Sequence, residues 1–198
     1  MTESIRCPWA EKSAIERDYH DREWGTPQHD ERVLFEFLLL EGAQAGLSWR
    51  TILARREGYR AVFDGFDAQR MAAYTDADLA RRLQDPRIIR NRLKVQAARS
   101  NARCYLELCA ERGGLAPYLW GWVDGRPLCN QWQQAAQVPA RTPLSDAISA
   151  DLRRRGFRFV GSTIIYAYLQ AVGVVNDHLL DCFRHRTAGG LSADGSLM

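Results

Sequence analysis

The sequence of 198 residues predicts an all-α fold, and three observations carry that prediction. Apolar residues recur at helical spacing through most of the chain. Capping residues, Gly or Pro stand at the ends of these runs. No alternating pattern of useful length indicates a strand. Hydrophobic residues make up 46% of the chain, so we expect one domain over residues 1–187, with a disordered tail over residues 188–198.

Each helix expected in the first half of the chain follows a residue that can cap it. The expected helices run from Asp30 to Leu40, from Ser48 through Trp49–Arg56, from Asp67 to Tyr74, and over Leu79–Gln84 behind a capping box of Thr75 and Asp78. The longest helix should run from about Arg87 to Arg112, where Gly113 and Gly114 end it.

The second half of the chain has the same character. Helices are expected over Leu115–Trp122, from Thr142 and Pro143 to Arg155, over Ser162–Ala171 and from Asn176 to about Arg184. Between the first two of these, Asp124 and Gly125 indicate a turn and Pro127–Arg141 an irregular segment.

Charge and cysteine content narrow the class of protein only slightly. The net charge of +3 is mildly basic, although eight of the nine charged residues from Arg81 to Arg103 are basic. Such a segment either binds phosphates or is a solvated helix surface. Five cysteines without an apolar leader indicate a cytoplasmic protein without a disulfide framework. No apolar run is long enough to suggest a membrane as partner.

Glu41 is the most informative single residue. If Val33–Glu41 forms one helix, Glu41 lies in the middle of its apolar face, whereas Glu36 points toward water. A carboxylate in that position is costly unless a cation or a hydrogen-bond donor meets it. Two interpretations remain open: Glu41 faces a pocket at the end of the helix, or it pairs with an arginine at the edge of the core.

Two distant parts of the chain carry a possible metal site. His178 and Cys182 stand four residues apart, on one side of the expected last helix, and Cys7 and His20 lie near the other terminus. Together they make a Cys2His2 set, which is typical of a closed structural zinc site. Such a site would join the two ends of the chain. The alternative is a buried Cys182 beside an exposed His178, without a metal.

The segment 153–164 reads as two helices joined by a tight turn at Gly156 and Gly161. The backbone N–H groups of Gly161, Ser162 and Thr163 would then be exposed at a helix N-terminus, which is a ready anion site. Flanked by arginines, it would hold a DNA phosphate without reading any base. The alternative is an ordinary helical hairpin.

Aromatic residues gather near the N-terminus, at Trp9, Tyr19, Trp24 and Trp49. A base taken out of a duplex must recover its lost stacking, and aromatic walls provide it. A carboxylate beside such walls would accept hydrogen bonds from exocyclic amines. The other tryptophans, at positions 120, 122 and 132, are interpreted as core residues.

Four motifs along residues 19–25, 40–49, 156–164 and 175–178 then become recognisable together. They read Tyr19-His20-Asp21-x-Glu23-Trp24-Gly25, Leu40-Glu41-Gly42-x-Gln44-Ala45-Gly46-Leu47-Ser48-Trp49, Gly156-Phe157-x-Phe159-Val160-Gly161-x-Thr163-Ile164 and Val175-Asn176-Asp177-His178. In order and spacing they resemble the motifs of the 3-methyladenine DNA glycosylase I family. The resemblance covers residues 7 to 182 and implies the all-α helix-hairpin-helix DNA glycosylase fold.

The resemblance also implies roles for individual positions. Glu41 matches the carboxylate that recognises the damaged base, and Tyr19 and Trp49 match its aromatic contacts, with Trp9 and Trp24 nearby. The implied structural zinc ligands are Cys7, His20, His178 and Cys182. The implied DNA contacts are Gly46 and Leu47 at the gap left in the duplex and, in the hairpin, Gly156, Arg158, Phe159, Gly161, Ser162 and Thr163.

One position departs from the family pattern. The family usually has a second pocket tyrosine four residues before the zinc histidine, where this chain has Glu16. Either Glu16 turns to solvent, or it faces the base and favours a cationic lesion. Asp177 also has two readings, because many relatives carry a catalytic Asp there, and beside His178 it would instead orient the zinc site.

The expected function is that of a monofunctional, monomeric glycosylase. It would flip 3-methyladenine out of double-stranded alkylated DNA and hydrolyse the N-glycosidic bond, without a nucleotide cofactor. Two alternatives compete with this expectation. One is a non-catalytic DNA-binding module of the same fold, and the other is a zinc hydrolase using His178, Cys182 and a carboxylate.

Overall fold

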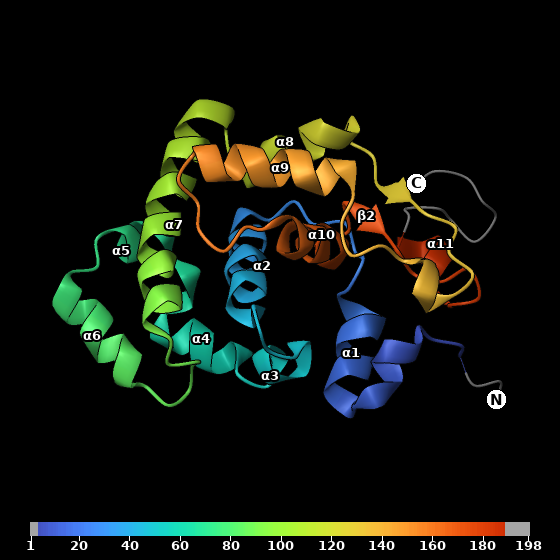
Figure 1. Cartoon of the computed structure of the whole chain (residues 1–198), viewed down its shortest axis with the longest axis horizontal. Helices are drawn as coiled ribbons and strands as arrows, with labels where there is room; N and C mark the ends of the chain where they lie inside the picture. Colours follow the sequence, from blue (N-terminus) through green and yellow to red (C-terminus); the bar gives the residue numbers. More distant parts are fainter. Residues whose placement is uncertain (1–3, 189–198) are drawn as a thin grey trace.

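The computed structural model describes residues 4–188, and most of them are helical (Figure 1). The α helices are α1 (Ala14–Arg22), α2 (Glu31–Gln44), α3 (Trp49–Leu53), α4 (Arg56–Val62), α5 (Ala68–Ala72), α6 (Asp76–Gln84), α7 (Arg92–Arg112), α8 (Leu115–Trp120), α9 (Pro143–Arg154), α10 (Ser162–Ala171) and α11 (Arg184–Ala188). Short 3-10 helices are η1 (Pro8–Lys12), η2 (Asp64–Phe66), η3 (Gly121–Val123) and η4 (Ala135–Gln137). The predicted tail falls almost wholly on residues 189–198, outside the described part.

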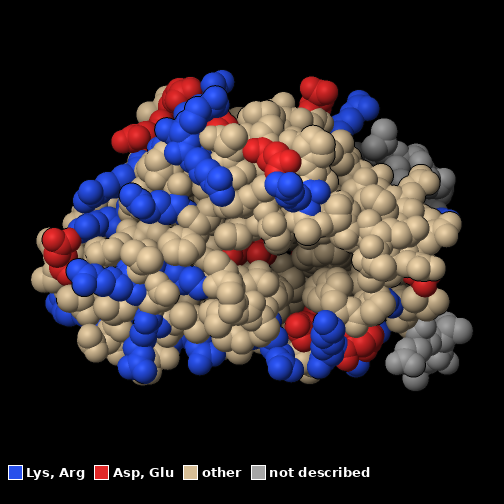
Figure 2. Space-filling model, viewed as in Figure 1, with Lys and Arg blue, Asp and Glu red and all other residues tan. Residues whose placement is uncertain are grey.

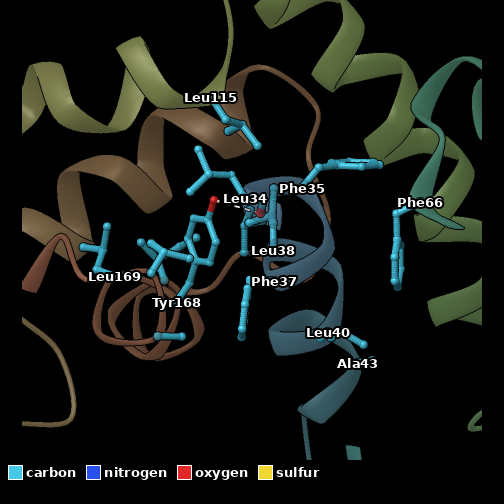
Figure 3. Close-up of a cluster of buried hydrophobic side chains, with 14 of the residues drawn as sticks. Leu34, Phe35, Phe37, Leu38, Leu40, Ala43, Phe66, Leu115, Tyr168 and Leu169 are labelled. Atoms are coloured by element: carbon cyan, nitrogen blue, oxygen red, sulfur yellow. Dashed lines mark hydrogen bonds between the residues drawn. The ribbon is translucent and has the colours of Figure 1, made fainter. Parts of the chain in front are cut away.

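Helix α2 is the centre of the molecule, with α3, α7, α8 and α10 packed against it (Figure 1). It begins where the Asp30 carboxylate accepts a hydrogen bond from the Val33 N–H at 2.9 Å. Its side chains interdigitate with those of α10, and the Tyr168 hydroxyl donates to the Leu34 carbonyl at 3.0 Å (Figure 3). Neighbouring elements cover α2 on nearly every side, so Glu41, which is buried near the end of the helix, is held in a fixed position.

The prediction that Glu36 points to water is wrong. Its side chain is buried, and it pairs with Arg56 at 2.5 Å and with Arg60 at 2.9 Å. Both arginines come from α4, a helix that the sequence analysis did not predict. The Arg56 guanidinium also lies 4.8 Å from the centroid of the Phe37 ring. The polar side of α2 is therefore covered by a cationic helix rather than by solvent.

The end of α2 is fastened to α7 and to the α9–α10 turn. Lys94 of α7 donates through Nζ to the carbonyls of Ala43 at 2.8 Å and Ala45 at 2.7 Å. These two carbonyls belong to the last turn of α2 and its C-cap, where no intrahelical donor is available. At Gly42, a Cβ would stand 3.2 Å from Cβ of Phe159, so the absence of a side chain permits this close approach.

Helices α9 and α10 form the predicted helical hairpin. Gly156 ends the first helix with a φ of 91°, as expected for a glycine terminator. Within the turn the second left-handed residue is Phe159, with a φ of 56°, whereas Gly161 has a φ of −60° and caps α10. Asn101 of α7 holds the turn, because its side chain accepts from the Arg158 N–H at 2.8 Å and donates to the Arg158 carbonyl at 2.9 Å.

Several predicted boundaries differ from the observed ones. Helix α7 begins at Arg92, capped by Asn91, because Asp85 folds back on the Arg87 N–H at 2.9 Å and closes a turn before it. The predicted helix Asn176–Arg184 is wrong. Its first residue belongs to β2 (Val175–Asn176), which pairs in parallel with β1 (Leu128–Cys129), so short strands do occur. Turns follow, and they begin where the Asn176 side chain accepts from the His178 N–H at 3.1 Å.

The three tryptophans interpreted as core residues differ from one another. Trp120 is buried as predicted, and its Nε1 donates to the Gln28 carbonyl at 2.8 Å. Trp122 is 40% exposed, so its assignment to the core is wrong. Trp132 is partly buried and donates to Asp177, a bond described with the site below.

Candidate active site

A pocket of about 430 Å³ opens between α1, the end of α2, α3 and α10. Its lining includes all six residues that the sequence analysis assigned to catalysis or base binding, namely Trp9, Glu16, Tyr19, Trp24, Glu41 and Trp49. Figure 2 shows a hollow near the middle of one face of the molecule, with recessed acidic atoms at its side. The volume suits one flat heteroaromatic ring system with room for an attached sugar.

Glu41 is part of the lining of this pocket. Its residue is 4% exposed, and among residues 4–188 its carboxyl group has no hydrogen bond and no ion pair. The alternative of a salt bridge with an arginine is therefore wrong. Burial raises the pKa of Glu41 from 4.5 to about 8. An unpaired buried carboxyl beside a cavity is the arrangement expected of a ligand-binding group.

Aromatic rings form the walls around Glu41. The Tyr19 and Trp49 ring centroids are 5.5 Å apart, and those of Trp9 and Trp24 are 5.0 Å apart with nearly perpendicular planes. The Tyr19 hydroxyl and Trp49 Nε1 are both buried and have no hydrogen-bond partner within the described residues. Burial and the nearby Glu41 raise the pKa of Tyr19. The pocket thus offers flat apolar surfaces together with unused polar groups.

Glu16 also belongs to this lining and is buried. The structure does not turn its side chain out to solvent. The Ser13 hydroxyl donates to Glu16 Oε2 at 2.6 Å, while the Ser13 side chain accepts from the Glu16 N–H at 3.3 Å. One carboxylate oxygen of Glu16 is thus engaged by the N-cap of α1, and the pocket contains a second acidic group.

The four predicted metal ligands converge beside the pocket. The ligating atoms of Cys7, His20, His178 and Cys182 lie within 4.8 Å of one another, and all four residues are buried. Cys182 Sγ is 3.4 Å from His20 Nε2 and 3.5 Å from His178 Nδ1, and Cys7 Sγ is 3.8 Å from His178 Nδ1. Ligands at ordinary zinc–sulfur and zinc–nitrogen bond lengths around a tetrahedron stand about 3.5 Å apart, so the set could hold a metal ion.

Outer partners fix the two imidazoles in this cluster. His20 Nδ1 lies 2.8 Å from an oxygen of Asp21, and His178 Nε2 lies 3.1 Å from the Trp24 carbonyl. Each partner is an acceptor, so the opposite ring nitrogen is left free to face the cluster. Burial lowers the pKa of His178, which favours the neutral imidazole. The same Trp24 forms a wall of the pocket, so the cluster supports that wall directly.

Asp177 occupies a different environment from either one predicted for it. Its carboxylate accepts four hydrogen bonds, from Asn130, Trp132, Tyr166 and Gln170, at 2.5 to 2.8 Å. None of these donors is a ligand of the Cys/His cluster. Asp177 lines a neighbouring cavity of about 320 Å³ and does not line the pocket that contains Glu41. It is a fully engaged structural carboxylate.

The residues predicted to contact DNA lie on two segments. Gly46, with a φ of 77°, and Leu47, 39% exposed, stand on the loop after α2. The hairpin residues follow α9, next to a hollow that Arg99, Arg103, Arg153 and Arg158 line. Lys and Arg side chains gather over the part of the surface that holds α6 and α7 (Figure 2). Asn101 and Lys94, which hold these two segments, had no signal in the sequence, because their partners are backbone atoms far along the chain.

The comparisons with known proteins agree with this architecture. A family model described as methyladenine glycosylase matches residues 9–185. DNA-3-methyladenine glycosylase 1 of Escherichia coli (strain K12) is 45% identical over 177 residues, covering 89% of this chain and 95% of that protein. DNA-3-methyladenine glycosylase of Haemophilus influenzae is 44% identical over 181 residues, covering 90% of this chain and 97% of that protein.

The chain is also similar to solved structures of the same kind of enzyme. A crystal structure of 3-methyladenine DNA glycosylase I superposes with a TM-score of 0.89 at 48% identity, covering 91% of this chain and all of that one. The Staphylococcus aureus enzyme, in a structure described as the basis of 3-methyladenine recognition, gives 0.88 at 33% identity, covering 91% and 96%. A Tyr-to-Phe variant of such an enzyme was solved in complex with 3-methyladenine, at 0.88 and 33%, covering 91% and 97%.

The fold and the site place the chain in a class of all-α proteins in which an aromatic pocket surrounds an unpaired carboxyl group. Among the described residues, no helix combines the length and apolar character that crossing a membrane requires. The extent of the matches then decides the family. This chain belongs to the methyladenine glycosylase family.

Proposed function

We propose that this protein is a DNA-3-methyladenine glycosylase of base excision repair, which flips the damaged nucleotide from DNA and hydrolyses its N-glycosidic bond. The observation that carries the proposal is Glu41, a buried carboxyl with no partner in an aromatic pocket. The named relatives at 44–45% identity over most of the chain support the same activity.

The chemistry of the lesion explains why so few groups are needed. A purine methylated at N3 carries a formal positive charge, so its glycosidic bond is already weakened and the base leaves neutral. The enzyme must extract the nucleotide, hold the base and favour the separation of charge. Flipping costs a few kcal/mol, and stacking on aromatic side chains recovers about 1–3 kcal/mol per base. The rings of Tyr19 and Trp49 suit that purpose.

Glu41 supplies the discrimination. An unmethylated adenine lacks the positive charge that compensates for a buried carboxylate, whereas a methylated base brings it. Because burial raises the pKa of Glu41 to about 8, the empty pocket at neutral pH holds the protonated acid. Binding of the cationic base favours the ionised form, so the carboxyl gives up its proton as the substrate enters. Water then captures the sugar cation.

We propose double-stranded DNA as the partner of the monomer. The first N–H groups of α10, at Ser162 and Thr163, have no intrahelical acceptor and would bind a backbone phosphate, as in a helix-hairpin-helix motif. Leu47 would fill the gap that the flipped nucleotide leaves. The rigid attachment of both segments to α7, through Lys94 and Asn101, supports a single docking surface.

The reaction is proposed to be monofunctional. The chain has lysines only at positions 12 and 94. Lys94 is held by two carbonyls at the end of α2, and Lys12 lies at the rim of the pocket with its side chain in solvent. Neither is a buried amine poised against the sugar. Borohydride treatment of enzyme with methylated DNA should therefore trap no covalent adduct, and a trapped adduct would overturn this part of the proposal.

We further propose that the Cys/His cluster binds one structural zinc ion. A zinc ion there would join the segment before α1 to the segment after β2 and would keep Trp24 in place. Four protein ligands leave no open position for water, which argues against a catalytic metal and therefore against the zinc hydrolase alternative.

Chromatography of the bases released from methylated DNA tests the activity. We expect 3-methyladenine in the soluble fraction with the wild-type protein. The Glu41→Ala and Glu41→Gln variants should release little, although they should remain folded. DNA binding without release of any base would instead identify the protein as a non-catalytic DNA-binding module.

A further inference from the structure

Gln170 stands between the pocket and the carboxylate behind it. It lies on α10, one turn after Ala167, and both residues line the pocket that contains Glu41. Gln170 also lines the cavity on the other side, together with Asp177. The Gln170 side chain is partly exposed to solvent. No motif in the sequence pointed to it, because its role depends on partners from three segments.

The orientation of the Gln170 amide is determined by its neighbour. Gln170 Nε2 donates to Asp177 Oδ2 at 2.6 Å. A carboxylate only accepts, so the nitrogen end of the amide, and not the oxygen end, must face Asp177. Asp177 itself cannot turn, because Asn130 and Trp132 donate to Oδ1 at 2.6 and 2.8 Å and Tyr166 donates to Oδ2 at 2.5 Å.

This arrangement leaves an acceptor without a partner. Among the described residues, no hydrogen bond reaches Gln170 Oε1. Gln170 lines both the pocket and the cavity that contains Asp177, so with Nε2 bound to Asp177 the amide atom left for the pocket is Oε1. Glu41 offers a second acceptor there. Two acceptors in an apolar, aromatic pocket select a ligand with more than one N–H and disfavour a carbonyl in the same place.

From these contacts we infer that Gln170 is a specificity residue, whose Oε1 accepts a hydrogen bond from the exocyclic amine of the flipped adenine. Asp177 is the positioning residue that keeps that oxygen aimed at the base. The inference rests on the proposed function. The amine at C6 has two N–H groups, enough for Gln170 and Glu41 together. A purine with a carbonyl at C6 presents an acceptor to an acceptor and is rejected.

A pair of free bases and a pair of variants test this assignment. The bases are 3-methyladenine and 3-methylhypoxanthine, which differ at C6 in carrying an amine or a carbonyl. The variant Gln170→Met keeps the length of the side chain and removes the acceptor. The control, Gln131→Met, makes the same chemical change at an exposed position whose side chain has no hydrogen bond to the described residues. Binding is measured by tryptophan fluorescence, and release of 3-methyladenine from methylated DNA is measured in parallel.

For Gln170→Met we expect 3-methyladenine affinity to fall roughly three- to tenfold, as for one lost hydrogen bond. Affinity for 3-methylhypoxanthine should stay equal or rise, so that the preference between the two bases narrows. An equal loss of affinity for both bases, which a purely structural role predicts, would overturn the inference. An unchanged preference between the two bases would overturn it as well. If Gln170→Met does not fold, Gln170→Ala answers the same question. Failure of the wild type to release 3-methyladenine refutes the proposed function instead.

Discussion

Among single residues, the environment of each carboxyl group decides its role. Glu36 and Glu41 stand on the same helix, and both are buried. Glu36 is neutralised by two arginines, whereas Glu41 has no partner within the described residues and faces a cavity. A buried unpaired acid lowers stability, and proteins retain such groups where binding of a ligand compensates for the loss.

Glu41→Gln should therefore stabilise the folded protein while reducing its activity. The folded pKa of Glu41, about 8, lies above the unfolded value of 4.5, so the wild type loses stability as pH rises between these values. The Glu41→Gln variant has no ionisable group at this position, so its stability does not fall in this way as pH rises. We expect its advantage in the free energy of unfolding to be near zero at pH 4 and about 4 kcal/mol at pH 8. Urea denaturation at both pH values measures it, and an equal difference at the two values would contradict the assigned environment.

Glu16 gives a second residue-scale prediction. Since Glu16 lines the pocket, Glu16→Tyr should tighten binding of free 3-methyladenine by restoring one stacking wall, by about tenfold. Fluorescence titration of the two proteins measures the change. Glu11→Tyr, an exposed change on η1, is the control. If affinity does not change in Glu16→Tyr, the side chain at this position does not contact the base.

At the scale of elements, caps and terminators made most helices predictable. Asp30, Thr75 and Thr142 begin α2, α6 and α9 as expected, and Gly113 and Gly156 end α7 and α9. The sequence did not reveal α4, whose arginines acquire meaning only against Glu36, nor the turns that follow β2. Contacts between residues distant in the sequence determine the structure of such segments, so local sequence patterns do not predict it.

Asn101 tests the rigidity of the hairpin. Asn101→Ala removes two partly buried hydrogen bonds to the Arg158 backbone, so we expect a loss of about 1–3 kcal/mol in the free energy of unfolding. Affinity for abasic-site DNA should fall, while binding of free 3-methyladenine in the distant pocket should not change. Denaturation, gel shift and fluorescence titration measure the three quantities. A parallel loss of free-base binding would show that the turn is not an independent DNA-binding element.

At the scale of the whole molecule, the two ends of the chain are held together. The Phe183 N–H donates to the Ile5 carbonyl at 3.0 Å, beside the Cys/His cluster. Residue types alone left this meeting of the four ligands as one of two interpretations, and the resemblance to the 3-methyladenine DNA glycosylase I family then favoured it. It could not predict that Trp24 would connect the cluster to the pocket wall.

Removal of the proposed zinc should affect the fold and the activity together. A chelator under mildly destabilising conditions should lower the melting temperature and base release in parallel, and added zinc should restore both. Asp21→Asn, which weakens the outer contact of His20, should reduce metal affinity about 10–100-fold. Metal analysis that finds no zinc in the purified protein, or loss of activity with an unchanged melting temperature, would rule out a structural site.

Carbon-13 NMR titration of the Glu41 carboxyl group, assigned with Glu41→Gln, measures whether this acid is buried and unpaired. We predict a pKa near 8 in the free protein, because burial leaves the acid without a partner, and a lower pKa once 3-methyladenine occupies the pocket and donates to the carboxylate. A pKa near the ordinary value of 4.5 in both states would mean that the group is solvated or paired with a cation. Recognition of the damaged base by Glu41 would then be excluded.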